Sequence, residues 1–130
     1  MHDVTSEATT LRLRTLRRLL GRDRQLRVFG AASSVGEVRC ELSNTRAIAA
    51  VVDDNGVLAG TVSTVDLAGI APERSIGEIM DRSAPTAAAE LEVEDAWQLA
   101  RAQRADRVVV ISPKGELLGI LSIGELAAAR

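Results

Sequence analysis

The chain has 130 residues and a formal net charge of −2, and Phe29 and Trp97 are its only aromatic residues. This length suits one compact domain or two small units with a shared aliphatic core. It contains no run of about eighteen apolar residues, so we expect no membrane span, and its polar first residues predict no secretory signal. A single cysteine, Cys40, cannot form an internal disulfide, which favours a cytoplasmic protein and a small, buried apolar role for this side chain.

Positive charge is concentrated at the N-terminus. Residues 1–30 contain seven arginines and three acidic residues, a net of +4, whereas residues 31–130 carry a net of −6. A solvated helix face explains this asymmetry best. An anionic partner is the alternative, but the scarcity of aromatic residues makes nucleic-acid binding the weakest of the functions considered.

Residues 1–10 are predicted to be frayed, and residues 11–20 to form a helix in which Leu13, Leu16 and Leu20 share one face. Residues 1–14, which precede the first repeat, are together assigned to a flexible tail. A short strand is expected at residues 27–29. Ser34 and Glu37 then form the capping-box signature of a helix start.

Residues 49–68 form the pattern around which the chain is organised. Two apolar runs, residues 48–52 and 57–62, flank Asn55-Gly56, which is the strongest short-range signal for a β-hairpin. Ser63-Thr64-Val65-Asp66 follows and predicts the start of a short helix.

The same pattern returns 59 residues later, at residues 108–127, with seven of the twenty aligned positions identical. The repeat extends upstream, because residues 75–82 align with residues 15–22. Between these segments the second copy predicts a strand at residues 86–88 and a helix from Val93. We therefore expect two repeats, residues 15–70 and 75–130, each helix–β–α–β–β–α, related by a pseudo-two-fold axis.

This order of elements, the segment SIGEIM, the doubled VV-x-x-x-x-G-x-L-x-G pattern and the S-x-x-[DE] after the last strand together resemble the CBS domain. Two such domains in tandem resemble a Bateman module. The resemblance implies an α+β fold and a regulatory module that binds an adenosine-containing ligand, such as AMP, ATP or S-adenosylmethionine, in clefts between the copies. It also implies a homodimer that regulates a partner protein.

The resemblance also implies the roles of individual residues. The acidic residue of the S-x-x-[DE] motif receives the ribose hydroxyls, the motif's Ser or Thr lies near phosphate, and a threonine on the first strand lies near the base. Apart from the resemblance, Arg104 and Arg107 precede the third strand of copy two, where an arginine can meet a phosphate, but a surface salt bridge with Glu94, Asp95 or Asp106 is the favoured interpretation. The nucleotide-binding candidates are Ser63, Thr64, Asp66, Thr86, Ser122, Glu125 and Arg107.

Two interpretations of the S-x-x-[DE] motif stay open. Its carboxylate either receives a ribose or folds back to cap its own helix. Glu125 stands where the family usually has Asp, and its extra methylene disfavours a bidentate grip. The proline that family members often carry before the second strand is replaced by Ala50 and Val109. We therefore expect one site, centred on Asp66, and a capping role for Glu125.

Catalysis has little support in the sequence. The only histidine, His2, lies in the predicted tail, and no glycine-rich phosphate loop occurs. We expect no enzyme activity, no metal and no cofactor beyond a regulatory nucleotide. The alternative function is a ligand-free dimerisation or protein-interaction module, in which Trp97 is a core or dimer contact.

Overall fold

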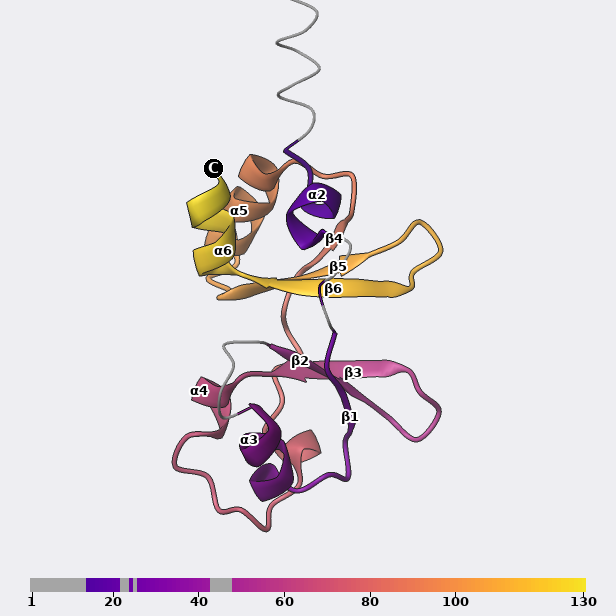
Figure 1. The fold of residues 1–130 in the computed structure, drawn as a ribbon, viewed down its shortest axis with the longest axis vertical. Coiled ribbons are helices and arrows are strands. Elements are labelled where there is room, and N and C mark those ends of the chain that lie inside the picture. The colour runs from indigo at the N-terminus through magenta and orange to yellow at the C-terminus, as the bar shows by residue number, and fades with distance from the viewer. Residues whose placement is uncertain (1–13, 22–23, 25, 43–47) are drawn as a thin grey trace, which may run out of the picture. The chain divides into compact units, whose positions relative to one another are not determined.

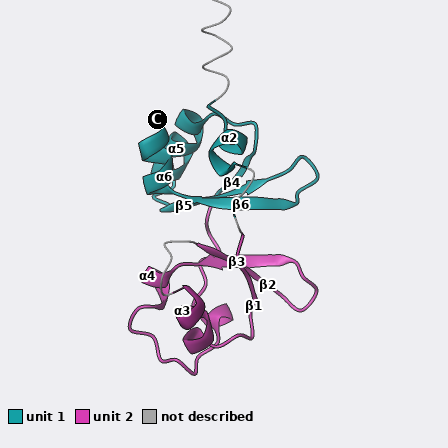
Figure 2. Ribbon diagram, in the orientation of Figure 1, with its two compact units in different colours: residues 1–24, 85–130 teal, residues 25–84 magenta. Residues whose placement is uncertain are grey.

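The computed structural model describes residues 14–21, 24, 26–42 and 48–130. The chain divides into two compact units (Figure 2). Unit 1 combines residues 1–24 with residues 85–130, and unit 2 comprises residues 25–84. In the described part of the chain, no helix is long and apolar enough to cross a membrane.

Unit 2 contains one three-stranded sheet of order β1-β2-β3. Strands β1 and β2 are parallel, and β2 and β3 are antiparallel. A parallel pair requires a crossover connection, and α3 lies between the two parallel strands in the chain. The elements of unit 2 are β1 (Val28–Gly30), α3 (Val35–Leu42), β2 (Ala49–Val52), β3 (Leu58–Val62), α4 (Thr64–Leu67) and the 3-10 helix η1 (Ile76–Glu78).

Unit 1 repeats this topology with a sheet of order β4-β5-β6, and its helices gather on one face of the sheet (Figure 1). The mixed α+β fold predicted from the sequence is therefore confirmed. The elements of unit 1 are α2 (Leu16–Leu20), β4 (Thr86–Ala88), α5 (Val93–Ala102), β5 (Arg107–Ile111), β6 (Leu117–Ser122) and α6 (Ile123–Ala129).

Each unit has its own aliphatic core between sheet and helices. In unit 2 the predicted stripe of α3, namely Val35, Val38 and Leu42, is fully buried with residues of β2 and β3. In unit 1 the inward-facing Val108 and Val110 of β5 pack with α2, α5 and α6. Because side chains alternate along a strand, the residues between them face the other side of the sheet.

The β2–β3 hairpin forms as predicted, but only glycine supplies the positive φ. The Gly56 amide donates to the Asp53 carbonyl at 3.0 Å, and the Asp53 amide donates to the Val57 carbonyl at 2.9 Å. Gly56 has a φ of 79°, whereas Asn55 is not among the residues with positive φ. The Asp53 carboxylate also accepts the Asn55 amide at 2.9 Å, so it stabilises the turn from within.

The compact units exchange the segments that lead into the two sequence repeats. α2, at the start of the first repeat, packs into the core of unit 1, and Ile76 of η1, at the start of the second, packs into the core of unit 2. Each segment lies against a glycine in the second strand of the hairpin, Gly119 of β6 in unit 1 and Gly60 of β3 in unit 2. A Cβ at Gly119 would lie 2.6 Å from Leu20 Cδ2, and a Cβ at Gly60 would lie 2.8 Å from Met80 Sδ. The missing side chain of each glycine leaves room for the neighbouring segment.

Several element boundaries differ from the prediction. α2 begins at Leu16, with the Thr15 hydroxyl accepting the Arg18 amide at 3.4 Å as its N-cap, so the helix predicted from residue 11 was extended too far at residues 14–15. Residues 1–13 and the predicted helix end at residues 43–45 lie outside the described residues. The helix expected from Ser75 is a single 3-10 turn, and Ser75 makes no side-chain cap.

Candidate functional site

The Ser63–Asp66 segment forms the N-terminus of α4 in unit 2. The Ser63 hydroxyl accepts the Asp66 amide at 3.3 Å, and the Asp66 carboxylate accepts the Ser63 amide at 3.0 Å. The segment therefore forms a complete capping box, which is the second of the two interpretations left open for this motif. Ser63, Thr64 and Asp66 are all half-buried. The capping bonds hold the Asp66 side chain in one orientation, which is also what a binding carboxylate requires.

The Ser122–Glu125 segment forms the same capping box at the start of α6 in unit 1. The Ser122 hydroxyl accepts the Glu125 amide at 3.0 Å, and Glu125 Oε1 accepts the Ser122 amide at 3.2 Å. The second carboxylate oxygen, Oε2, is paired with the Arg24 guanidinium. Both oxygens of Glu125 are therefore engaged within unit 1.

Thr86 and Arg107 lie on neighbouring strands of the unit 1 sheet. Thr86 pairs with Val109 of β5, and Arg107 pairs with Ser122 of β6. Arg107 and Val109 alternate along β5 with Val108 and Val110, which face the helices, and Thr86 is the partner of Val109. Thr86 and Arg107 therefore share the sheet face that points away from the helices. Thr86 is exposed, and Arg107 is buried. The structure thus brings Thr86, Arg107 and Ser122 to one region of unit 1.

The ion pair of Arg107 favours the salt-bridge alternative for this residue. Its Nε and Nη2 donate to Oδ1 and Oδ2 of Asp106 at 2.8 and 3.1 Å. The Arg107 side chain is only 2% exposed, so the pair is not the surface salt bridge that was expected, although Asp106 itself is 66% exposed. The Arg107 guanidinium lowers the pKa of Asp106 below its ordinary value, against the opposing effect of partial burial.

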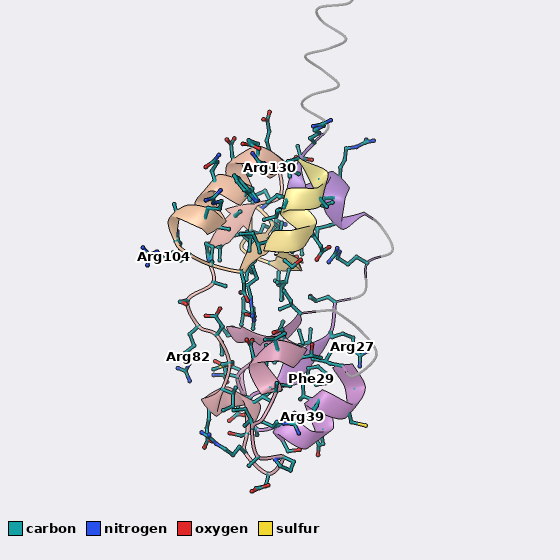
Figure 3. The ribbon with its side chains drawn as sticks, turned by 90° about the vertical axis from the view of Figure 1, so that its left-hand side faces the viewer. Arg27, Phe29, Arg39, Arg82, Arg104 and Arg130 are labelled. Carbon is teal, nitrogen blue, oxygen red and sulfur yellow. The ribbon has the colours of Figure 1, made fainter. Side chains whose placement is uncertain are left out.

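Two arginines that sequence reasoning missed hold the motif helices in place. Arg24 donates to the Ile120 carbonyl at 3.2 Å in addition to its pair with Glu125. Arg39 of α3 donates from Nη2 to the carbonyl of Leu67, the last residue of α4, at 2.7 Å and to the carbonyl of Ile70, just after the helix, at 2.5 Å (Arg39 is labelled in Figure 3). Neither partner is close in sequence, so no local pattern could have indicated these contacts.

Two segments of the chain match one protein-family model. The model, described as the CBS domain, matches residues 23–73 and again residues 76–130. The chain belongs to the CBS domain family. The two matches follow each other directly along the chain, which confirms the tandem CBS pair that the internal repeat predicted.

Solved CBS-domain structures share the fold over most of the chain. The CBS-domain protein ATU1752 from Agrobacterium tumefaciens is 24% identical, with a TM-score of 0.75 over 89% of this chain and 92% of that one. CBSX2 in complex with AMP is 25% identical, with a TM-score of 0.69 over 88% and 94%. The cytosolic domain of the Mg²⁺ channel MgtE in complex with ATP is 22% identical, with a TM-score of 0.65 over 81% and 45%. No curated protein matches the sequence.

Trp97, on α5 of the second CBS repeat, is half-buried against the core of unit 1. The Arg130 and Arg101 guanidiniums lie 3.5 and 4.7 Å from its ring centroid, within the range of cation–π attraction. Arg130 also pairs with Glu94 at 2.7 Å. Beside this cluster is a cavity of about 260 Å³ that contains none of the predicted nucleotide-binding residues; it is lined by Arg14, Glu92, Val93, Glu94, Ala129 and Arg130.

Cys40 corrects one expectation about this CBS pair. It lies on the exposed side of α3, so the prediction of a buried apolar side chain was wrong. Val38 and Leu42, two residues away on either side, are both buried. At the helical period, a residue midway between two buried positions turns outward. Among the residues that the structure describes, no cluster of His, Cys, Asp and Glu side chains could hold a metal ion.

The Asp106–Arg107 pair predicts a pH-dependent contribution to stability. Because the folded-state pKa of Asp106 is lowered, its contribution is present above the unfolded pKa, about 3.9, and is lost as pH falls through the folded value. Arg107→Met should therefore lower the free energy of unfolding more at pH 6 than at pH 2.5. Urea unfolding of both proteins at the two pH values measures this difference. A gap that stays constant with pH would show that the ion pair contributes nothing to the acid sensitivity.

Proposed function

We propose that this CBS pair is a regulatory module that binds an adenosine-containing ligand, with Asp66 as the acceptor for the ribose hydroxyls. The observation that carries the proposal is the AMP complex of CBSX2, which is 25% identical and has the same fold over 88% of this chain. The ATP complex of the MgtE cytosolic domain adds a second adenine nucleotide within the same fold. We further propose a cytoplasmic homodimer that transmits ligand occupancy to a partner protein without catalysing a reaction.

The geometry of Asp66 supports this role. Its carboxylate is half-buried and held by the Ser63 amide at 3.0 Å, so little side-chain entropy is lost when a ligand binds. Two hydroxyl donors on a carboxylate contribute about 1.5–3 kcal/mol each. With a buried base, these bonds are sufficient for an affinity near 1 μM, about −8 kcal/mol. We propose Ser63 and Thr64 as phosphate contacts through their hydroxyls, because α4 spans only four residues and has a weak dipole.

We also propose that Thr86 and Arg107 belong to the ligand-responsive part of unit 1, where they share one sheet face. Arg107 already pairs with Asp106, so a phosphate would compete with that carboxylate for the guanidinium. For Ser122 and Glu125 we propose that the main role is to cap α6 and that contact with a ligand is a secondary role.

Thermal unfolding with and without AMP, ATP and S-adenosylmethionine tests the proposal. At a ligand concentration of 100 times Kd, the folded state gains about 2.7 kcal/mol, which raises Tm by about 10 °C. Asp66→Ala should weaken binding about 100-fold, because it removes both hydroxyl contacts. Asp66→Asn retains an acceptor for the Ser63 amide. Its ligand affinity should therefore show the effect of losing the negative charge while the helix cap is kept.

Ser34→Ala is the matched control. The Ser34 hydroxyl accepts the Glu37 amide at 3.2 Å at the start of α3, so its removal costs about 1 kcal/mol of helix capping in the same unit. It should lower Tm as Asp66→Ala does and leave the ligand response intact. If no ligand raises Tm, or if Asp66→Ala retains the full shift, the sensor proposal is wrong.

The capping boxes themselves favour one alternative, a ligand-free interaction module. Both S-x-x-[DE] motifs are complete caps without any ligand, which is sufficient to explain their residue types. In that case Asp66→Ala and Ser34→Ala should both lower Tm by destabilising one helix each, and neither should change the response to nucleotide. Light scattering of wild type and a Trp97→Glu variant then measures whether α5 contributes to a dimer.

A further inference from the structure

Helix α4 carries the proposed ribose acceptor, Asp66, but is too short to be stable by itself. It spans the four residues Thr64–Leu67, which make about one turn. A single turn does not persist in water, because fixing it costs more conformational entropy than its few hydrogen bonds offset. The orientation of the Asp66 side chain therefore depends on contacts that hold both ends of α4.

The N-terminal end of α4 is held by its capping box, and the C-terminal end is held by α3. Nη2 of Arg39 donates to the Leu67 carbonyl at 2.7 Å and to the Ile70 carbonyl at 2.5 Å. The last carbonyls of a helix lack a donor within the helix, and an arginine near the end supplies one. Nε of Arg39 is buried and has no hydrogen-bond partner within the described part of the chain. The two bonds from Nη2 therefore offset part of the cost of burying this guanidinium.

Main-chain hydrogen bonds also attach the segment that follows α4 to α3. The Gly36 amide donates to the Pro72 carbonyl at 2.9 Å. The Val35 amide donates to the Arg74 carbonyl at 2.7 Å. A Cβ at Gly36 would lie 3.1 Å from the Cβ of Pro72, so the two segments are in close contact. Arg39 lies about one turn further along α3 and extends this row of contacts to α4 itself.

We propose that Arg39 is a positioning residue for the Asp66 site: it holds the C-terminal end of α4 and thereby fixes the direction in which the Asp66 carboxylate meets the ribose hydroxyls. This inference rests on the proposed function. The Leu67 amide donates to the Ser63 carbonyl at 3.3 Å, a long bond that is easily lost once the Leu67 carbonyl has no donor. An open turn releases Asp66 from the Ser63 amide, so a ligand has to reorder the motif and binds more weakly.

Calorimetric titration with AMP tests this role. Arg39→Met should weaken AMP binding about tenfold, because methionine retains the apolar part of the side chain and donates no hydrogen bond. Arg39→Lys retains a charged donor without the planar geometry and should weaken binding about threefold. Arg74→Met is the matched control, because it removes one positive charge from an exposed pair in the same unit. Its AMP affinity should stay within about twofold of wild type.

A double variant and a second ligand separate positioning from a general loss of stability. In an Asp66→Ala background, Arg39→Met should weaken AMP binding by less than about twofold, because the group that it positions is absent. 2′,3′-Dideoxy-AMP has no ribose hydroxyls for Asp66 to accept, so its affinity should also be insensitive to Arg39→Met. A merely destabilised unit 2 would lower the affinity equally in both backgrounds and for both ligands.

A wild-type AMP affinity in Arg39→Met overturns the inference, and so does a loss that persists in the Asp66→Ala background. If Arg39→Met does not fold, Arg39→Lys decides the same question, through a loss of affinity that disappears in the Asp66→Ala background. If Asp66→Ala weakens AMP binding but neither Arg39 variant does, only this inference fails. If wild type does not bind AMP, the inference fails together with the AMP site of the proposed function.

Discussion

Gly60→Ala is expected to lower the free energy of unfolding by about 3 kcal/mol, whereas Gly119→Ala should lower it by about 1 kcal/mol. Both glycines occupy the same position of the repeat, and each lies against the leading segment that packs into its unit. The difference lies in what the new methyl group meets. At Gly60 it would lie 2.9 Å from the Asp81 carbonyl oxygen, and main chain held in a β-bridge cannot move aside without losing hydrogen bonds.

At Gly119 the methyl group meets a side chain instead. It would lie 2.6 Å from Leu20 Cδ2 and 3.5 Å from Cδ1, and a change of leucine rotamer relieves most of that clash. Chemical denaturation of the two variants measures the difference.

Double variants test the cause of each loss. Leu20→Ala combined with Gly119→Ala should cost less than the sum of the two single changes, because the truncated side chain leaves room for the methyl group. Met80→Ala should recover little in Gly60→Ala, since the Asp81 carbonyl remains in place. Equal losses of unfolding free energy at Gly60 and Gly119 would contradict this account of the two contacts.

Arg39→Met is expected to lower the free energy of unfolding by about 3 kcal/mol. Nη2 of Arg39 donates to the carbonyl of the last residue of α4 and to the Ile70 carbonyl just after it, and each hydrogen bond from a charged donor is worth about 1.5–3 kcal/mol. Methionine retains the apolar part of the side chain and removes both donors. Hydrogen exchange at the Leu67 amide, which donates to the Ser63 carbonyl at 3.3 Å, should accelerate with it.

Arg74→Met is the matched control for the loss of an arginine in unit 2. Arg74 pairs with Glu78 at 3.1 Å, both side chains are about half exposed, and the residues are four apart. Such a pair contributes about 0.3–0.5 kcal/mol. Arg39→Lys should fall between the two, because one ammonium retains the charge but replaces the planar donor geometry. An Arg39→Met loss no larger than that of Arg74→Met would show that α4 does not depend on α3.

Interactions between residues close in sequence were predicted well. The hairpins, the α3 stripe and the Ser63–Asp66 cap each involve partners no more than 15 positions apart, so the local residue pattern contains all the participants. Two predictions from local sequence signals were wrong. The segment from Ser75 has the same signature as a helix start but forms one 3-10 turn, and the Arg14–Thr15 stretch bonds to the Glu92–Val93 region instead of entering α2. In both cases contacts with a distant segment outweighed weak helix propensity.

The sequence by itself determined that the chain is a duplicated α+β pair, because the repeat, its strand periods and its capping motifs are all local or self-similar. The resemblance to the CBS domain was also visible in the sequence, and the match of the family model confirmed it. Only the tertiary structure showed that the leading segments exchange between units, that they lie against Gly60 and Gly119, and that Arg24 pairs with Glu125 from 101 positions away. The physical reason is that such contacts depend on which surfaces meet after folding. No residue type or spacing along the chain specifies the partner of an arginine that lies a hundred residues away.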